Sequence, residues 1–185
     1  MHGGVSRIGT VEVSFDCTGP GAVQLGATRP QMTWSLSGIG ADDDDLDGLP
    51  TTSSTRGPAE PDTHPNGTIE IDHVVVMSHA PERTKAELEK RGLEARRVRD
   101  AGNGMSQTFF KMREVVLELI GPKVADDDTP AHFYGLAFTV EDLDTTAAFL
   151  GDKLGRVKDA VQSGRRIATL RKEAGAGIAV AFMSR

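Results

Sequence analysis

Two apolar stretches decide the fold of this chain: Ile71-Asp72-His73-Val74-Val75-Val76 at residues 71–76, and Phe133-Tyr134-Gly135-Leu136-Ala137-Phe138 at residues 133–138. After each stretch come the signals of a helix with a charged start, a glycine-containing break and apolar strands separated by turns. A unit repeated at roughly 60 residues predicts two similar modules that close a core together. The cleft between two such modules is the expected place for a ligand.

The first predicted module covers residues 68–122. Its helix is marked by Pro81 and Glu82 in the first turn and by Gly92 just past the end. Three strands should follow, at residues 95–98, 106–112 and 115–120, with a turn at 102–104 between the first two.

The second predicted module covers residues 131–185. Asp142 is a fitting N-cap, and the apolar residues of the helix after it recur along one face, namely Leu143, Ala147, Leu150 and Leu154. Three more strands are expected at residues 157–161, 167–171 and 178–183. The fold class is therefore α+β, with two βαβββ modules whose antiparallel sheets are backed by helices.

The first 67 residues differ from this pattern. Alternating apolar positions between residues 5 and 36 predict a β-ribbon, an amino-terminal extension that covers residues 1–37 and packs on the repeated unit. Residues 38–67 are rich in proline and threonine and contain the run Asp42-Asp43-Asp44-Asp45, so we expect a mobile acidic linker. The run lacks the ligand spacing of a calcium-binding EF-hand loop, which favours a solvated acidic surface.

Bulk composition narrows the choice of partners. The 185 residues carry a formal net charge of −6 and a pI near 5.4, which argues against a nucleic acid or an anionic membrane surface as the main partner. No stretch approaches the ~20 apolar residues that span a bilayer, and the start does not read as a signal peptide. With the single cysteine Cys17 there is no disulfide framework, so a cytoplasmic location is expected.

Two passages carry a resemblance to a known family. One runs from Leu136 to Leu150, as a strand that leads into a helix, and the other pairs residues 71–76 with Val115-Val116-Leu117-Glu118-Leu119-Ile120-Gly121-Pro122. In their order and doubled spacing these passages resemble the vicinal oxygen chelate superfamily, which includes glyoxalase I, extradiol dioxygenases, bleomycin-resistance proteins and methylmalonyl-CoA epimerase. The resemblance covers residues 68–184 and implies a glyoxalase-like fold.

The resemblance also implies a divalent-metal site, with ligands from the first and last strands of each module. Carried over by position, the first module offers His73 and Glu118, a pair that suits Zn²⁺, Ni²⁺, Mn²⁺ or Fe²⁺. The second module offers Gly135 and Ala181, which cannot bind a metal. A third ligand would have to come from elsewhere, and the candidates are Gln107, His132 and Glu114. The alternative is that His73 is hydrogen-bonded in a polar cavity and Glu118 pairs with an arginine.

Substrate contacts are expected from the neighbouring strands. Arginines lie on or beside the second strand of the first module and before the matching strand of the second, at Arg96, Arg97, Arg99, Arg165 and Arg166. Guanidinium groups recognise carboxylates and phosphates, so an acidic or CoA-like substrate would fit if one of them faced the cleft. Most such arginines only solvate a sheet. The predicted substrate-binding residues are Gln107, Phe109, Arg97 and Arg166.

Three functions remain open from the sequence. The leading hypothesis is a glyoxalase-like lyase or isomerase, or a dioxygenase-like enzyme, that acts on a small oxygenated substrate with Glu118 as catalytic base. The alternative is a protein that binds and sequesters a small molecule, as bleomycin-resistance proteins do. The third is a fold retained for assembly, with a homodimer or the amino-terminal ribbon closing the cleft.

Overall fold

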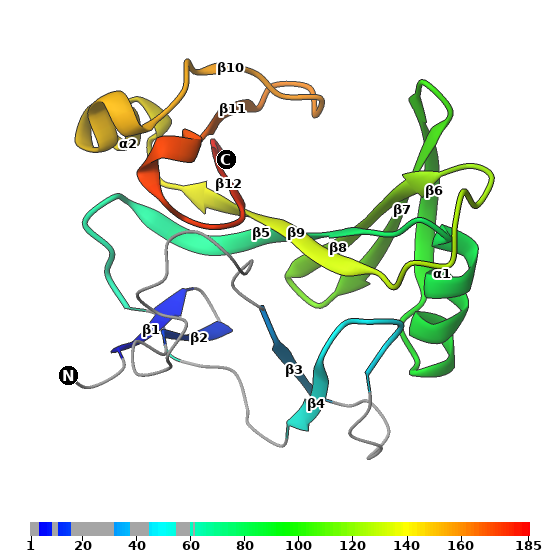
Figure 1. The fold of residues 1–185 in the computed structure, drawn as a ribbon. Helices are drawn as coiled ribbons and strands as arrows, with labels where there is room; N and C mark the ends of the chain where they lie inside the picture. The colour runs from blue at the N-terminus through cyan, green and yellow to red at the C-terminus, as the bar shows by residue number, and fades with distance from the viewer. Residues whose placement is uncertain (1–3, 9–10, 16–31, 38–44, 55–59, 61) are drawn as a thin grey trace. The chain divides into compact units, whose positions relative to one another are not determined.

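A computed structural model describes residues 4–8, 11–15, 32–37, 45–54, 60 and 62–185 (Figure 1). The chain forms two compact units. Unit 1 contains the described parts of Met1–Gln31, Pro58–Asp72 and Leu136–Arg185, and unit 2 contains those of Met32–Gly57 and His73–Gly135. Two long strands, β5 (Thr68–Met77) and β9 (His132–Val140), contribute residues to both units.

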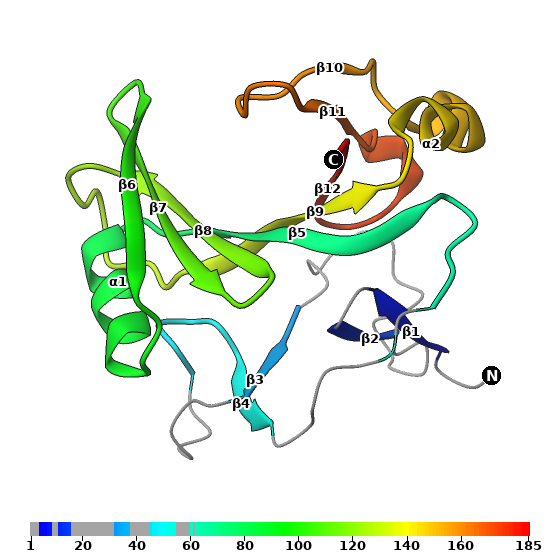
Figure 2. The same cartoon turned by 180° about the vertical axis from the view of Figure 1, so that it is seen from behind.

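Unit 2 contains most of the first module. Its strands follow the order β5-β8-β7-β6, with β8 at Val115–Pro122, β7 at Met105–Met112 and β6 at Ala95–Gly102. Strand β8 runs parallel to β5 and antiparallel to β7, which in turn is antiparallel to β6. Figure 2 shows β6, β7 and β8 side by side. The three strands after the helix fall where the sequence predicted them, with β6 longer than expected.

Helix α1 (Pro81–Lys90) packs against β8 and covers one face of this sheet (Figure 1). Leu117 and Leu119 of β8 are buried, as are Phe110 of β7 and Leu88 of the helix. Because neighbouring side chains on a strand point to opposite faces, the residues next to Leu117 and Leu119 on β8 and next to Phe110 on β7 face the other way. The core of unit 2 therefore takes one face of the sheet and leaves the other for polar side chains.

Unit 1 contains most of the second module, with the strand order β10-β11-β12-β9. Its elements are helix α2 at Leu143–Leu150, the 3₁₀ turn η1 at Gly151–Lys153, β10 at Lys158–Asp159, β11 at Arg166–Thr169, the 3₁₀ turn η2 at Lys172–Ala174 and β12 at Ala179–Met183. A core cluster forms between helix and strands from Val140, Leu143, Leu154, Ala168 and Phe182. The α+β class and both βαβββ series are as predicted.

Two details of the second module differ from the sequence prediction. The helix ends a turn early, because Gly151 adopts φ +56° and the chain leaves the helical path. Leu154 lies beyond the helix in an extended conformation, yet it is buried in the same cluster. Its spacing from Leu150 therefore indicated a buried position and not a helical one. The strand expected at 157–161 shrinks to Lys158–Asp159, and Val161 is 76% exposed.

The amino-terminal ribbon is present and differs in detail. Strands β1 (Gly4–Ile8) and β2 (Val11–Phe15) pair antiparallel, so both strands of the ribbon come from the first 15 residues. Strand β3 (Trp34–Ser37) pairs instead with β4 (Thr51–Ser54), and the two are parallel. Cys17 and residues 42–44 of the acidic run lie outside the described residues.

The predicted linker is structured where it is described. Besides β4, Leu46 and Leu49 are buried and exchange two backbone hydrogen bonds of 3.0 Å across a tight turn. Between them, Asp47 accepts hydrogen bonds from Arg83 (2.9 Å) and Thr84 of helix α1. The low average hydrophobicity of residues 38–67 predicted a linker, and two isolated leucines do not change that average enough to predict a buried turn. None of the helices in the described part of the chain has the length and apolarity that crossing a bilayer requires.

Candidate functional site

Four adjacent strands of unit 2 bring together one polar side chain each on the sheet face away from helix α1. The residues are His73 on β5, Glu118 on β8, Gln107 on β7 and Arg99 on β6. The strand register explains the grouping. Glu118 lies opposite Val75, and His73 lies two residues before Val75 on the same strand, so His73 and Glu118 share a face of the sheet. Across β7, Gln107 lies opposite Arg99 on one side and opposite Ile120, two residues after Glu118, on the other.

The two predicted metal ligands, His73 and Glu118, face each other. His73 Nε2 lies 3.4 Å from Glu118 Oε2, and the two side chains are only 15% and 11% exposed. A carboxylate this deeply placed must be hydrogen-bonded or paired, because burying a bare charge is costly. The pairing of β5 with β8 thus places an imidazole beside a carboxylate in a largely desolvated position.

Gln107 and Arg99 extend this pair into a chain of hydrogen bonds. Gln107 Nε2 donates to Glu118 Oε1, and Arg99 Nη2 donates to Gln107 Oε1. Since Arg99 has no acceptor atom, the amide of Gln107 must turn its oxygen to Arg99 and its N–H group to Glu118. One oxygen of Glu118 is thereby held, and the other faces His73.

The remaining predicted substrate contacts fall in different places. Phe109 lies opposite Glu118 in the register, and its ring centroid is 6.0 Å from the Arg99 guanidinium carbon, at the outer limit of a cation–π contact. Arg97 lies opposite Phe109 and is exposed. Arg166 belongs to unit 1, where it makes two hydrogen bonds of 3.0 and 2.9 Å to Asp144, and those bonds raise the pKa of the guanidinium.

Arg99 is the site residue that the sequence prediction did not select. A β-bulge between Ala95 and Arg97 shifts the β6–β7 register by one residue. Without the bulge Val98 would lie opposite Gln107, whereas with it Arg97 and Arg99 take the polar face. Alternation along a strand puts Arg97 and Arg99 on one face, but only the bulge decides which face that is.

The donor set at His73 and Glu118 supplies two of the three protein ligands that a catalytic zinc usually takes. In the part of the chain that the structure describes, no third histidine, cysteine or carboxylate joins them in a group whose ligand atoms lie within 4.8 Å of one another. Gln107, one of the predicted third ligands, turns its N–H group to Glu118 and its oxygen to Arg99. The described residues therefore do not complete the expected site.

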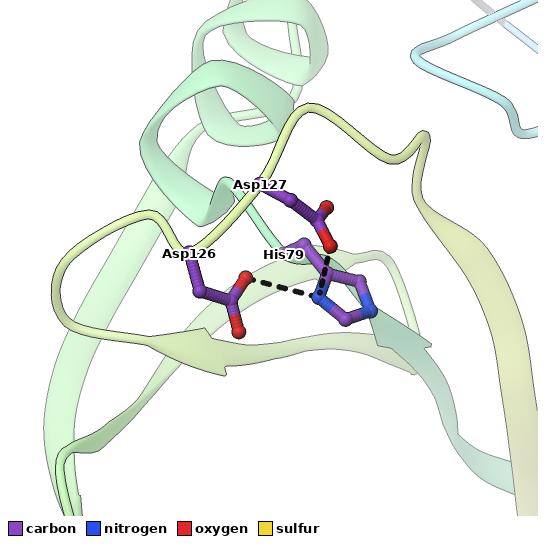
Figure 3. A group of neighbouring side chains, drawn as sticks. All are labelled: His79, Asp126 and Asp127. Carbon is purple, nitrogen blue, oxygen red and sulfur yellow. Dashed lines mark hydrogen bonds and ion pairs between the residues drawn. The ribbon is translucent and has the colours of Figure 1, made fainter.

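A different group of described residues could hold a divalent cation. His79 follows β5, and Asp126 and Asp127 lie in the loop after β8 (Figure 3). His79 was not among the predicted site residues, and its partner Asp126 lies 47 residues further along the chain. Nothing local to either segment could have indicated the grouping.

Comparison with solved structures places the fold. Methylmalonyl-CoA epimerase from Mycobacterium tuberculosis aligns with a TM-score of 0.52 at 15% identity, over 66% of this chain and 91% of the epimerase. A Streptomyces coelicolor methylmalonyl-CoA epimerase variant in complex with 2-nitronate-propionyl-CoA aligns with a TM-score of 0.50 at 20% identity, over 63% and 94%. A hypothetical protein from Bacillus halodurans aligns at 0.51 and 14% identity, over 63% and 94%.

These neighbours confirm the predicted glyoxalase-like fold. At identities of 20% or less the likeness concerns the fold and leaves the chemistry to the site. No protein-family model matches the sequence, and a search of curated proteins likewise finds no match.

Proposed function

We propose that this protein is an acid–base enzyme that moves a proton on a small oxygenated, acidic substrate held against the polar sheet face of unit 2. One observation carries the proposal, the hydrogen-bonded chain Arg99–Gln107–Glu118 that ends at His73. General acid–base catalysis needs a side chain held in position to take or give a proton, and a carboxylate with one oxygen held and the other beside an imidazole meets that need.

In this proposal Glu118 is the base. Its Oε2 takes the proton from the carbon next to the substrate carbonyl, and the electron pair of the broken C–H bond moves into the carbonyl to form an enolate. His73, 3.4 Å away, exchanges that proton with solvent before Glu118 returns a proton to the carbon. Gln107 and Arg99 keep Glu118 oriented. No step passes through a metal, because the described ligands do not complete a metal site.

The substrate class we propose is an acyl-CoA thioester. The neighbours of similar fold include methylmalonyl-CoA epimerases, one of them in complex with a CoA ester. A proton next to a thioester carbonyl is the kind that such a base removes. Phe109 would supply an apolar contact, and the exposed Arg97 on the same face would bind a substrate carboxylate or phosphate. A role for Arg166 stays a prediction.

Isotope exchange tests this function without knowledge of the product. The full chain is incubated with propionyl-CoA and methylmalonyl-CoA in D₂O, and deuterium at the carbon next to the carbonyl is measured by mass spectrometry. Glu118→Gln should lower the exchange rate at least about 100-fold, because the base is lost while the shape stays. Glu89→Gln, on the exposed side of α1, is the matched control and should match the parent chain. Equal exchange in Glu118→Gln and the parent chain would refute the assignment.

A second candidate function is a binding protein of the bleomycin-resistance type. The observation that favours it is the incomplete donor set at His73 and Glu118. It predicts that small molecules raise the unfolding temperature equally with and without a chelator, while no thioester exchanges deuterium. A ligand whose stabilisation vanishes on adding chelator would contradict this second function.

A further inference from the structure

Figure 3 shows three side chains that point at one place from two separate segments. His79 Nδ1 lies 2.9 Å from Asp126 Oδ1 and 3.4 Å from Asp127 Oδ2, and all three ligand atoms lie within 4.8 Å of one another. His79 belongs to the connection between β5 and α1, and the two aspartates belong to the loop after β8. The group is separate from the His73–Glu118 pair and does not depend on the function proposed above.

The imidazole sets this group apart from an ordinary patch of acidic residues. Nδ1 carries at most one hydrogen, so it cannot donate a full hydrogen bond to both carboxylates that face it. A cation bound by all three atoms satisfies both carboxylates at once. Bonds of about 2.1 Å place neighbouring ligand atoms roughly 3.0 Å apart around an octahedral ion and roughly 3.4 Å apart around a tetrahedral one. The two separations from His79 Nδ1, 2.9 and 3.4 Å, lie in this range, and the two carboxylate oxygens lie within 4.8 Å of each other.

The ligand atoms are also held in place. The backbone N–H group of Asp126 donates to the carbonyl oxygen of His79 at 3.2 Å, which joins the two segments. Asp127 uses Oδ1 to accept from the backbone of Thr129 at 2.7 Å, so Oδ2 is left facing His79.

Exposure of the group leaves room for an ion and its waters. The side chains of His79, Asp126 and Asp127 are 38%, 57% and 49% exposed, so an ion can enter from solvent and keep water in its remaining coordination positions. One imidazole nitrogen with two carboxylate oxygens is a donor set suited to borderline divalent transition metals.

We propose that His79, Asp126 and Asp127 bind one divalent transition-metal ion, with Zn²⁺ as the representative. The ion ties the loop at residues 123–130 to the connection in front of α1. Its role is structural, because the three residues lie outside the hydrogen-bonded chain that leads to Glu118.

Calorimetric titration of ZnCl₂ into the full chain, after dialysis against a chelator, tests the site. The background is the variant His73→Ala/Glu118→Gln, in which the other pair can no longer bind an ion. That background should bind one Zn²⁺, and adding His79→Gln or Asp127→Asn should weaken binding at least about tenfold. Circular dichroism checks that each variant keeps its fold.

Asp128→Asn is the matched control, since Asp128 is equally acidic, adjacent in sequence and fully exposed, and it pairs at 3.6 Å with Arg83 instead. Asp128→Asn should change the affinity less than about twofold, because a diffuse charge in solvent contributes little. An equal loss in Asp128→Asn and Asp127→Asn would mean unspecific attraction and would overturn the site. Absence of binding up to about 1 mM Zn²⁺ would overturn it as well.

Discussion

Each unit contains a little-exposed carboxylate beside a nitrogen-bearing side chain, and the two units differ in the kind of side chain that is the partner. In unit 1, Asp72 forms an ion pair of 2.7 Å with Arg165 and accepts a hydrogen bond of 3.1 Å from Thr139. In unit 2, the partner of Glu118 is an imidazole, and its other oxygen is held by an amide. A guanidinium is permanently charged and a histidine is not, so the first cluster is fixed and the second can exchange a proton.

The two carboxylate clusters therefore differ although the two modules share one order of elements. Both modules keep the order of one strand, one helix and three strands. The second module carries Gly135 and Ala181 where the resemblance places ligands, and its neighbouring charged cluster is already neutralised. We interpret the Asp72 cluster as structural and the Glu118 cluster as chemical.

The largest expected effect comes from the junction of strand and helix in unit 2. A Cβ atom at Gly121 would lie 2.2 Å from the backbone oxygen of Ser78 and 3.0 Å from Pro81, and neither can move without displacing α1. Gly121→Ala should lower the free energy of unfolding by about 3 kcal/mol, measured by urea denaturation. The comparison in unit 1 is Gly155→Ala, which meets one backbone oxygen at 3.0 Å and should cost clearly less. A larger loss for Gly155→Ala would contradict this reading.

The Asp72 cluster should respond in stability alone. Arg165→Met removes the cation beside a carboxylate that is mostly shielded from solvent, so unfolding should become easier by about 1–3 kcal/mol. Deuterium exchange into a substrate, if present in the parent chain, should persist. The double variant Arg165→Met/Asp72→Asn should recover part of the loss, because the uncompensated charge is gone. Loss of exchange with unchanged stability would reverse the assignment of the two clusters.

The smallest expected effect concerns the helix of unit 1 and depends on pH. Asp142 caps α2 by accepting a hydrogen bond of 2.6 Å from the backbone of Thr145, and that bond lowers the pKa of Asp142 below 3.8. A carboxylate whose pKa is lower in the folded state stabilises above its unfolded pKa and loses that contribution as the pH falls through the folded value. Asp142→Ala should therefore lower the melting temperature slightly at pH 7, and the difference should shrink as the pH falls below the ordinary pKa range of aspartate. A difference that grows on acidification would exclude the cap as its cause.

Much of the fold could be predicted from local signals. Pro81 and Gly92 located the first helix, Asp142 located the second, and the repeated apolar stretches located β5 and β9. These signals gave wrong predictions where a residue is buried without belonging to the helix or strand that its spacing indicates. Leu154 kept helical spacing after the helix had ended, and Leu46 and Leu49 are buried inside a polar segment.

By itself the sequence determined the doubled α+β order and the presence of His73 and Glu118 on strands of one module, because alternation and helix ends are local properties. Only the tertiary structure decided which residues meet. The bulge at Ala95/Arg97 turned Arg99 toward Gln107, and the loop after β8 brought Asp126 to His79. Strand register and loop path depend on the packing of the whole sheet. No local sequence pattern links two residues that lie 47 positions apart, as His79 and Asp126 do.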